Sequence, residues 1–247
     1  MTINIANICE SNNHTILCAD RMLTVNLPNI EFEHGTCKLH KITENCAVAV
    51  AGNALAYSEL FDAVKIVLQQ HPTDSIPQIV NHITNTYKMA RMKKMEELIL
   101  LPAGLNLNEY KQMQQALSPV ILQPIFQKMV TYDFGLVLVV AGVDANGGHI
   151  YKILSPGTTQ CYNSIGYLAS GSGEHHSLAS LIENNCQNTL SLKDALIYTY
   201  EAKKRAEKAT GVGESTDIWI ISKDKIITLE DEKIKLLNKI YEGKKRY

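Results

Sequence analysis

The order of strand-like and helix-like segments is the feature that most constrains how this chain can fold. Alternating apolar and polar residues, separated by turn residues, predict two hairpins at the start, with strands at 2–9, 14–19, 35–42 and 46–51. Helical spacing then predicts helices at 54–70 and 76–100. Later segments repeat this order, with strands at 134–143, 149–154 and 160–169, helices at 175–185 and 192–209, strands at 217–222 and 225–229, and a charged C-terminal helix. The order predicts an α+β fold, a four-layer αββα sandwich of two mostly antiparallel sheets flanked by helices.

The segment at about 102–130 departs from this pattern. Asn108 is a candidate N-cap for a helix, and Pro119 and Pro124 are expected to interrupt the helical pattern that follows. We interpret the segment as a helical insertion. No linker divides the 247 residues, so the prediction is one domain over 1–247.

Charge and hydropathy exclude several classes of partner. The chain has 24 basic and 25 acidic residues, which leaves no overall field to attract nucleic acid or anionic lipid. The longest apolar stretch, at 134–143, is well short of the about 20 residues that span a bilayer. The first residues lack the basic start and apolar centre of a signal peptide. We therefore expect a cytoplasmic protein with neither a nucleic-acid nor a membrane partner.

The cysteine and histidine patterns give no sign of a metal site. The 6 cysteines are scattered singly without ligand spacing, so most are expected to be core residues of a protein in a reducing compartment. His175 and His176 are adjacent on a predicted helix and do not converge. We expect no metal and no cofactor.

Five short strings occur between these elements in a fixed order. They are ADRMLT at 19–24, KLHKI at 38–42, AG at 51–52, AGVD at 141–144 with GHIYKI at 148–153, and ASGSG at 169–173. In this order the strings resemble the proteasome β-subunit type of N-terminal nucleophile (Ntn) hydrolases, over most of the chain. AGN at 51–53 and an alignment through GVG at 211–213 and Asp217 look more like the bacterial ancestral β-subunit (Anbu) branch.

The resemblance implies a catalytic threonine. Thr2, exposed as the first residue once Met1 is removed, would be the nucleophile, with its own α-amine as general base. Lys38 would be the ammonium beside the hydroxyl, and Asp20 would hold that lysine charged and oriented. Relative to the family, the extra residues before Asp20 and Lys38 are placed in a turn at 10–14 and a loop at 26–34.

The resemblance also implies an oxyanion donor and a network around the amine. The Gly52 N–H, where a strand turns into a helix, would be the donor, and Ser172 would complete the network. The family's Asp-x-x-Ser has Glu207 and Thr210 as its nearest match here, and the alternative alignment uses Asp217 instead. Both alternatives stay open at this point.

A substrate pocket follows by analogy with the family. Val50, Ala54 and Ser58 would line a medium-sized, mostly apolar pocket, and the backbone of Thr24 would pair with an extended peptide as an added strand.

The resemblance leads to one main function and two alternatives. The main expectation is a threonine peptidase or amidase that forms an acyl-enzyme ester on Thr2. The alternatives are a transpeptidase or ligase that uses the same ester, and a catalytically silent ring subunit. The partners implied are a peptide or protein substrate and further copies of the chain in a ring or helical stack. An ATPase partner is left open.

Overall fold

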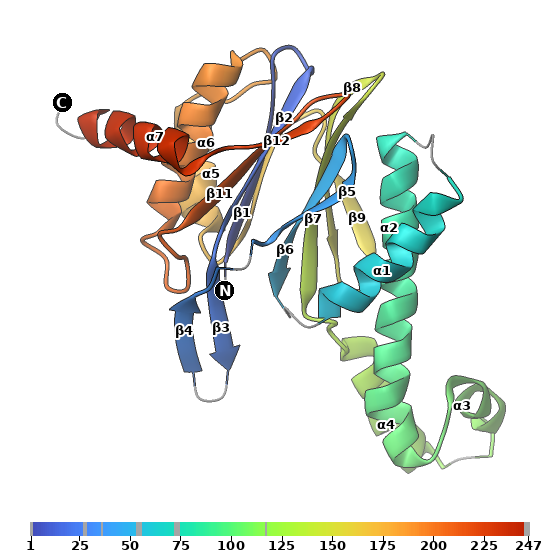
Figure 1. Ribbon diagram of the computed structural model, residues 1–247. Coiled ribbons are helices and arrows are strands. Elements are labelled where there is room, and N and C mark those ends of the chain that lie inside the picture. Colours follow the sequence, from blue (N-terminus) through green and yellow to red (C-terminus); the bar gives the residue numbers. More distant parts are fainter. Residues whose placement is uncertain are drawn as a thin grey trace.

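Two five-stranded sheets form the centre of the molecule (Figure 1). The computed structural model describes residues 2–26, 29–35, 37–52, 56–71, 75–116 and 118–244. The first sheet has the order β10-β1-β2-β11-β12 and consists of β1 (Ile3–Cys9), β2 (His14–Asp20), β10 (Tyr167–Gly171), β11 (Thr216–Ile221) and β12 (Ile226–Thr228). The second has the order β5-β6-β7-β8-β9 and consists of β5 (Leu39–Thr43), β6 (Cys46–Gly52), β7 (Leu136–Asp144), β8 (Gly147–Leu154) and β9 (Thr158–Cys161). Neighbouring strands in both sheets are antiparallel.

Helices cover the outer face of each sheet (Figure 1). The second sheet is covered by α1 (Ala56–Gln69) and α2 (Ile76–Met95), and the first by α5 (Glu174–Glu183), α6 (Leu192–Ala206) and α7 (Asp231–Lys244). Ser191 caps α6 as predicted, since its hydroxyl accepts from the Asp194 amide at 3.1 Å. The predicted α+β sandwich of two antiparallel sheets between helices is confirmed.

The apolar core lies in three layers because strand side chains alternate between faces. On β1, Ile3 and Ile5 pack towards α5 and α6. The layer between the sheets is rich in small side chains, with Ala6, Ala19, Ala47, Ala49 and Ala141 all buried there. Such strands are apolar on both faces and appear in the sequence as continuous apolar runs.

A two-stranded ribbon occupies the segment predicted as a loop at 26–34. The ribbon consists of β3 (Met22–Asn26) and β4 (Asn29–Glu33), paired antiparallel. The loop prediction is therefore wrong. The alternation of Leu23 with Val25 and of Ile30 with Phe32 is the sequence signal that indicates the ribbon.

The strand predicted at 160–169 is also wrong, because it is divided between the two sheets. Its start belongs to β9 and its end to β10. A turn separates them, in which the Ile165 and Gly166 amides both donate to the Tyr162 carbonyl and Gly166 has φ +85°. Glycine adopts this left-handed conformation without steric cost.

The segment after α2 is helical, as predicted, but its boundaries differ. After α2 the chain continues through a π turn, η1 (Glu96–Leu100), and a 3₁₀ turn, η2 (Leu101–Ala103), to α3 (Leu107–Met113) and α4 (Pro119–Thr131). Asn106, not Asn108, caps α3 by accepting from the Glu109 amide at 2.9 Å. Pro119 begins α4, a position at which a backbone N–H would have no partner within the helix. Pro124 lies inside the helix and does not interrupt it.

In the part of the chain that the structure describes, no helix combines the length and the apolar character needed to cross a bilayer.

Candidate active site

The two sheets bring Thr2, Asp20 and Lys38 to one end of the sandwich. Thr2 directly precedes β1 and Asp20 ends β2. Because β1 and β2 are antiparallel neighbours, with Asn4 opposite Ala19, the start of one strand meets the end of the other. Lys38 directly precedes β5 in the second sheet and reaches across to this pair.

These three side chains form one hydrogen-bonded cluster. The Lys38 Nζ lies 2.6 Å from the Thr2 Oγ1 and 2.9 Å from the Asp20 Oδ1. The Thr2 hydroxyl donates to the same Asp20 oxygen. Thr2 is 3% exposed and Asp20 is fully buried. An ammonium at this distance stabilises negative charge that develops on the threonine oxygen.

Backbone amides hold the Asp20 carboxylate in place. The Ile3 amide donates to Oδ1, and the Met22 and Gly213 amides donate to Oδ2, each at 3.0 Å. Burial raises the pKa of this carboxyl, but the Lys38 ammonium, the Thr2 hydroxyl and the amides together lower it by more than burial raises it. The pKa therefore lies below its usual range. Asp20 is therefore ionised at neutral pH.

The electrostatics of Lys38 act in the opposite direction. Burial lowers the pKa of its ammonium, and the charges of Asp20, Asp217 and Glu33 offset part of that effect. The net pKa is below the usual lysine range. Such a lysine is an easier proton donor than one in water.

The backbone around Ser172 fixes the position of Thr2. The Ser172 amide donates to the Thr2 carbonyl at 2.8 Å. Gly171 has φ +124°, and a Cβ there would lie 2.2 Å from the Thr2 carbonyl oxygen, so only glycine fits. The Ser172 side chain itself is exposed.

Gly52 lies at the end of β6, opposite Leu136 of β7, with φ +98°. A Cβ at this position would lie 2.0 Å from the Gly135 carbonyl oxygen. The backbone therefore requires glycine here whether or not its N–H serves as an oxyanion donor. Within the described residues, the hydrogen bonds of Thr2 reach Asp20, Lys38 and Ser172.

The two sequence alternatives for completing the site make contacts outside the threonine cluster. Glu207 accepts from Lys203 and Lys204, each at 2.5 Å. Asp217 forms a two-pronged ion pair with Arg21, at 2.5 Å and 2.9 Å. The part of the alternative alignment that reaches the cluster is Gly213, whose amide donates to Asp20.

Lys203 holds the loop that makes the contact between Gly213 and Asp20. Its side chain is fully buried, and its Nζ donates to Glu207 and, at 2.5 Å, to the Glu214 carbonyl. It thus ties α6 to the loop that carries Gly213. The last turn of α6 also contains Lys204 and Arg205, so the sequence does not indicate that Lys203 is buried.

The residues that the sequence suggested for a substrate pocket differ in burial and in the element to which they belong. Val50 is buried in the core beneath α1, and its amide donates to the Lys38 carbonyl at 3.1 Å. Ser58 is exposed on α1. The backbone of Thr24 pairs with Glu31 in the ribbon. Ala54 lies outside the described residues.

Residues 103–221 match the family model described as proteasome subunit. Over these residues the chain is similar to proteasome subunits. This similarity supports a hydrolase of the Ntn type and covers the strands from β7 to β11, with Ser172. Thr2, Asp20 and Lys38 precede the matched residues, so their arrangement is a separate observation. No curated protein gives a significant match to the sequence.

Proposed function

We propose that the protein is a threonine peptidase or amidase that works through an acyl-enzyme ester on Thr2. The observation that supports this most directly is the cluster in which the Lys38 Nζ lies 2.6 Å from the Thr2 hydroxyl oxygen. Thr2 becomes the first residue once Met1 is removed, and its free α-amine then serves as general base. An α-amine, with an ordinary pKa of about 7.7 to 8.0, accepts a proton readily near neutral pH.

The reaction has two stages, the formation of an ester on Thr2 and the hydrolysis of that ester. The α-amine takes the proton of the Thr2 hydroxyl while the oxygen attacks the carbonyl carbon of the scissile amide. In this proposal the Gly52 N–H donates to the oxyanion of the tetrahedral intermediate. The intermediate collapses, and the leaving amine takes the proton from the α-ammonium. Water then attacks the Thr2 ester by the same route and releases the acid.

Asp20 and Lys38 make the hydroxyl easier to ionise. The Lys38 ammonium stabilises the alkoxide and, as a like charge, keeps the nearby α-amine neutral. Asp20 keeps that lysine in place, and Ser172 holds the Thr2 backbone. In this proposal an extended peptide pairs with the Thr24 backbone, and Val50, Ala54 and Ser58 surround its side chain.

The partners in this proposal are a peptide or protein substrate and further copies of the chain. The family relation to proteasome subunits supports assembly into a homo-oligomer, since a subunit acts within an assembly.

The test is the intact mass of the purified protein before and after incubation with a peptide epoxyketone, which reacts with both the hydroxyl and the amine of an N-terminal threonine. The expected mass lacks Met1 and gains one inhibitor, mapped to Thr2. Thr2→Ala should gain none, while Thr2→Ser should still react. Retention of Met1 with no adduct would contradict the proposal and favour a silent subunit. Addition of free amines during peptide turnover distinguishes transpeptidation, which gives the amine adduct of the acyl group, from hydrolysis.

A further inference from the structure

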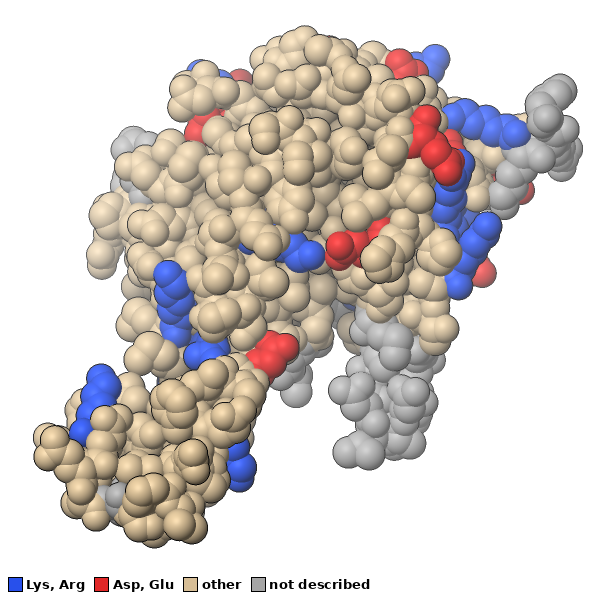
Figure 2. Space-filling view, turned by 180° about the vertical axis from the view of Figure 1, so that it is seen from behind, with Lys and Arg blue, Asp and Glu red and all other residues tan. Residues whose placement is uncertain are grey.

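The helical segment between α2 and β7 projects from the body of the molecule. We call η1, η2, α3 and α4 together the arm; it extends away from the sandwich in Figure 1 and is the lobe at the lower left of Figure 2. In Figure 2 most of its surface is uncharged. The arm carries large apolar side chains that are exposed, namely Leu98, Leu101, Met113, Val120, Ile121, Phe126 and Val130.

The helix α4 exposes apolar side chains beyond the face that it packs. Leu122, Ile125 and Met129 are partly covered and lie at the spacing of one helix face. Val120, 81% exposed, and Phe126, 56% exposed, point elsewhere, and no residue of α4 is buried. These exposed apolar side chains favour a further packing partner, because a helix of 13 residues has little stability without packing.

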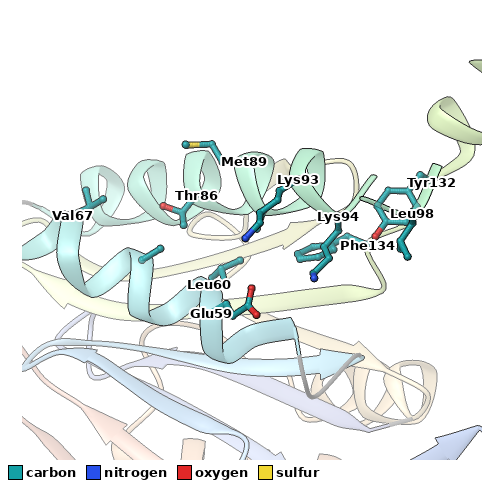
Figure 3. A pocket seen from close by; sticks show the side chains of 12 residues that line it. Glu59, Leu60, Val67, Thr86, Met89, Lys93, Lys94, Leu98, Tyr132 and Phe134 are labelled. Atoms are coloured by element: carbon teal, nitrogen blue, oxygen red, sulfur yellow. The ribbon is translucent and has the colours of Figure 1, made fainter. Parts of the chain in front are cut away.

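A groove of matching character lies on the same chain. It runs between α1 and α2 and encloses about 750 Å³ (Figure 3). Leu60, Val67, Met89 and Phe134 form apolar walls, with Met89 72% exposed. Its lining residues come from α1, α2, η1 and the segment after α4, so α4 of the same copy does not fill it.

The charges in and near the groove are balanced. Lys93 and Lys94 extend from α2 towards Glu59 on α1 (Figure 3). Lys94 forms an ion pair with Glu97 at 2.8 Å. The helix α4 has a single charged residue, Lys128. Apolar surfaces with few charges are typical of the centre of a protein interface, whereas membrane-surface helices are rich in Lys and Arg on one face.

We propose that α4 of one copy inserts its exposed apolar side chains, Phe126 and Val130, into the α1–α2 groove of the next copy. The occupant is a second copy because the exposed helix and the unfilled groove are both on this chain, and each lacks the cover that the other supplies. The contact joins two different surfaces, so it repeats head to tail and gives a ring if it closes or a helical stack if it does not. The inference rests on the homo-oligomer of the proposed function and names the contact that builds it.

The test is the molar mass in solution, from light scattering after size exclusion, of the wild type and three single variants. The wild type should exceed its chain mass of 27.5 kDa. Phe126→Lys on the arm and Met89→Lys in the groove should both be monomers. Leu236→Lys is the matched control, because Leu236 on α7 is 57% exposed, close to the value for Phe126. It should keep the wild-type mass.

Mixing the two disrupted variants tests the head-to-tail geometry. The Met89→Lys variant keeps an intact arm, and the Phe126→Lys variant keeps an intact groove. Together they should form a heterodimer of twice the 27.5 kDa chain mass and nothing larger. A wild-type monomer, a Phe126→Lys variant of wild-type mass, or a mixture that stays monomeric would overturn the proposal. A wild-type monomer that sediments with phosphatidylglycerol vesicles would assign the arm to membranes instead.

This experiment separates the contact from the catalytic proposal. Thr2→Ala should lose reaction with the epoxyketone and keep the wild-type molar mass. If Thr2 reacts with the inhibitor but the arm and groove variants do not change the mass, only the assembly inference fails.

Discussion

At the residue scale, the Asp20 carboxylate links the most elements of the site. It accepts from Thr2 and Lys38 and from the amides of Ile3, Met22 and Gly213. Five donors on one carboxylate leave almost no freedom for its orientation, and a charge in this buried position is tolerated because it is paired and hydrogen-bonded. The cost of removing it should be correspondingly large.

Asp20→Asn should destabilise the protein in a pH-dependent way. The variant leaves the buried Lys38 without its carboxylate, so the free energy of unfolding at pH 7 should fall by about 3 kcal/mol. The folded pKa of Asp20 is lowered below the unfolded value of about 3.9, so its stabilisation is complete above about pH 5 and is lost as pH falls through the folded pKa. Urea unfolding between pH 7 and pH 3 should show the difference constant at first and then shrinking.

The matched control for that measurement is Asp62→Asn. Asp62 pairs with Lys65 at 3.8 Å on the surface of α1, where its side chain is 76% exposed. Exposed pairs contribute less than about 1 kcal/mol, so this variant should unfold almost like the wild type at every pH. Equal effects of the two variants would show that Asp20 is not the buried anchor described above.

Lys203 should matter more than its neighbour Lys204, although both pair with Glu207. Lys203→Met removes both hydrogen bonds of a fully buried ammonium, to Glu207 and to the Glu214 carbonyl, and should lower the free energy of unfolding by about 2 kcal/mol. Lys204→Met removes only a contact to Glu207 and should cost less than about 1 kcal/mol. Similar urea midpoints for the two variants would contradict the anchoring role assigned to Lys203.

The thiols should differ sharply in reactivity. Burial raises the pKa of Cys18 and of Cys46 to about 12, so neither forms thiolate near neutral pH. Cys161 is exposed. A colorimetric thiol reagent at pH 8 should therefore modify Cys161 first, and Cys161→Ser should remove that fast phase. Rapid modification of a second thiol in folded protein would contradict the burial described for the core cysteines.

At the element scale, positive-φ glycines explain two of the sequence strings without reference to catalysis. Gly52 ends β6 against Gly135, and Gly171 ends β10 against Thr2. Both are places where two backbones approach too closely for a Cβ. Glycine at these two strand ends is thus required by the fold.

Gly52→Ala should be strongly destabilising. It combines the strain of φ +98° with a Cβ at 2.0 Å from a backbone oxygen, and the expected loss is more than about 3 kcal/mol in the free energy of unfolding. Gly104→Ala is the control, because φ is +73° there and a Cβ meets nothing within 4 Å. It should cost about 1 kcal/mol, from φ alone. Similar urea midpoints for the two variants would show that the β6–β7 approach can relax.

The sequence predicts elements well where burial repeats with a regular period. The strands with small inward side chains, such as Ala47 and Ala49 on β6, were predicted almost to their ends. The ribbon of β3 and β4 was missed because a loop there accounted for the length between Asp20 and Lys38. The cluster of Thr2, Asp20 and Lys38 could be anticipated from the family resemblance, and each of the three residues lies at a strand boundary. The buried position of Lys203 could not be anticipated, because its contact with the Glu214 carbonyl depends on how α6 packs against the loop 11 residues further along the chain.

At the scale of the whole molecule, the exposed apolar surface is unevenly distributed. Most of the large apolar side chains that are exposed belong to the side formed by α1, α2 and the arm. A monomer seldom keeps a contiguous apolar surface of this kind in water, because covering it stabilises the protein in proportion to its area. This uneven distribution is consistent with the proposed contact between copies, which uses the side formed by α1, α2 and the arm.

Assembly through that face should make thermal stability depend on protein concentration. If folded copies bind one another and unfolded chains do not, mass action raises the apparent stability as concentration rises. A hundredfold increase above the dissociation constant corresponds to about 2.7 kcal/mol for a single site. The wild type should therefore show a higher Tm at 100 µM than at 1 µM in scanning fluorimetry, and so should Leu236→Lys. Phe126→Lys, which lacks the contact, should melt at the same temperature at both concentrations. A concentration-dependent Tm in Phe126→Lys would mean that copies meet through a surface other than the arm.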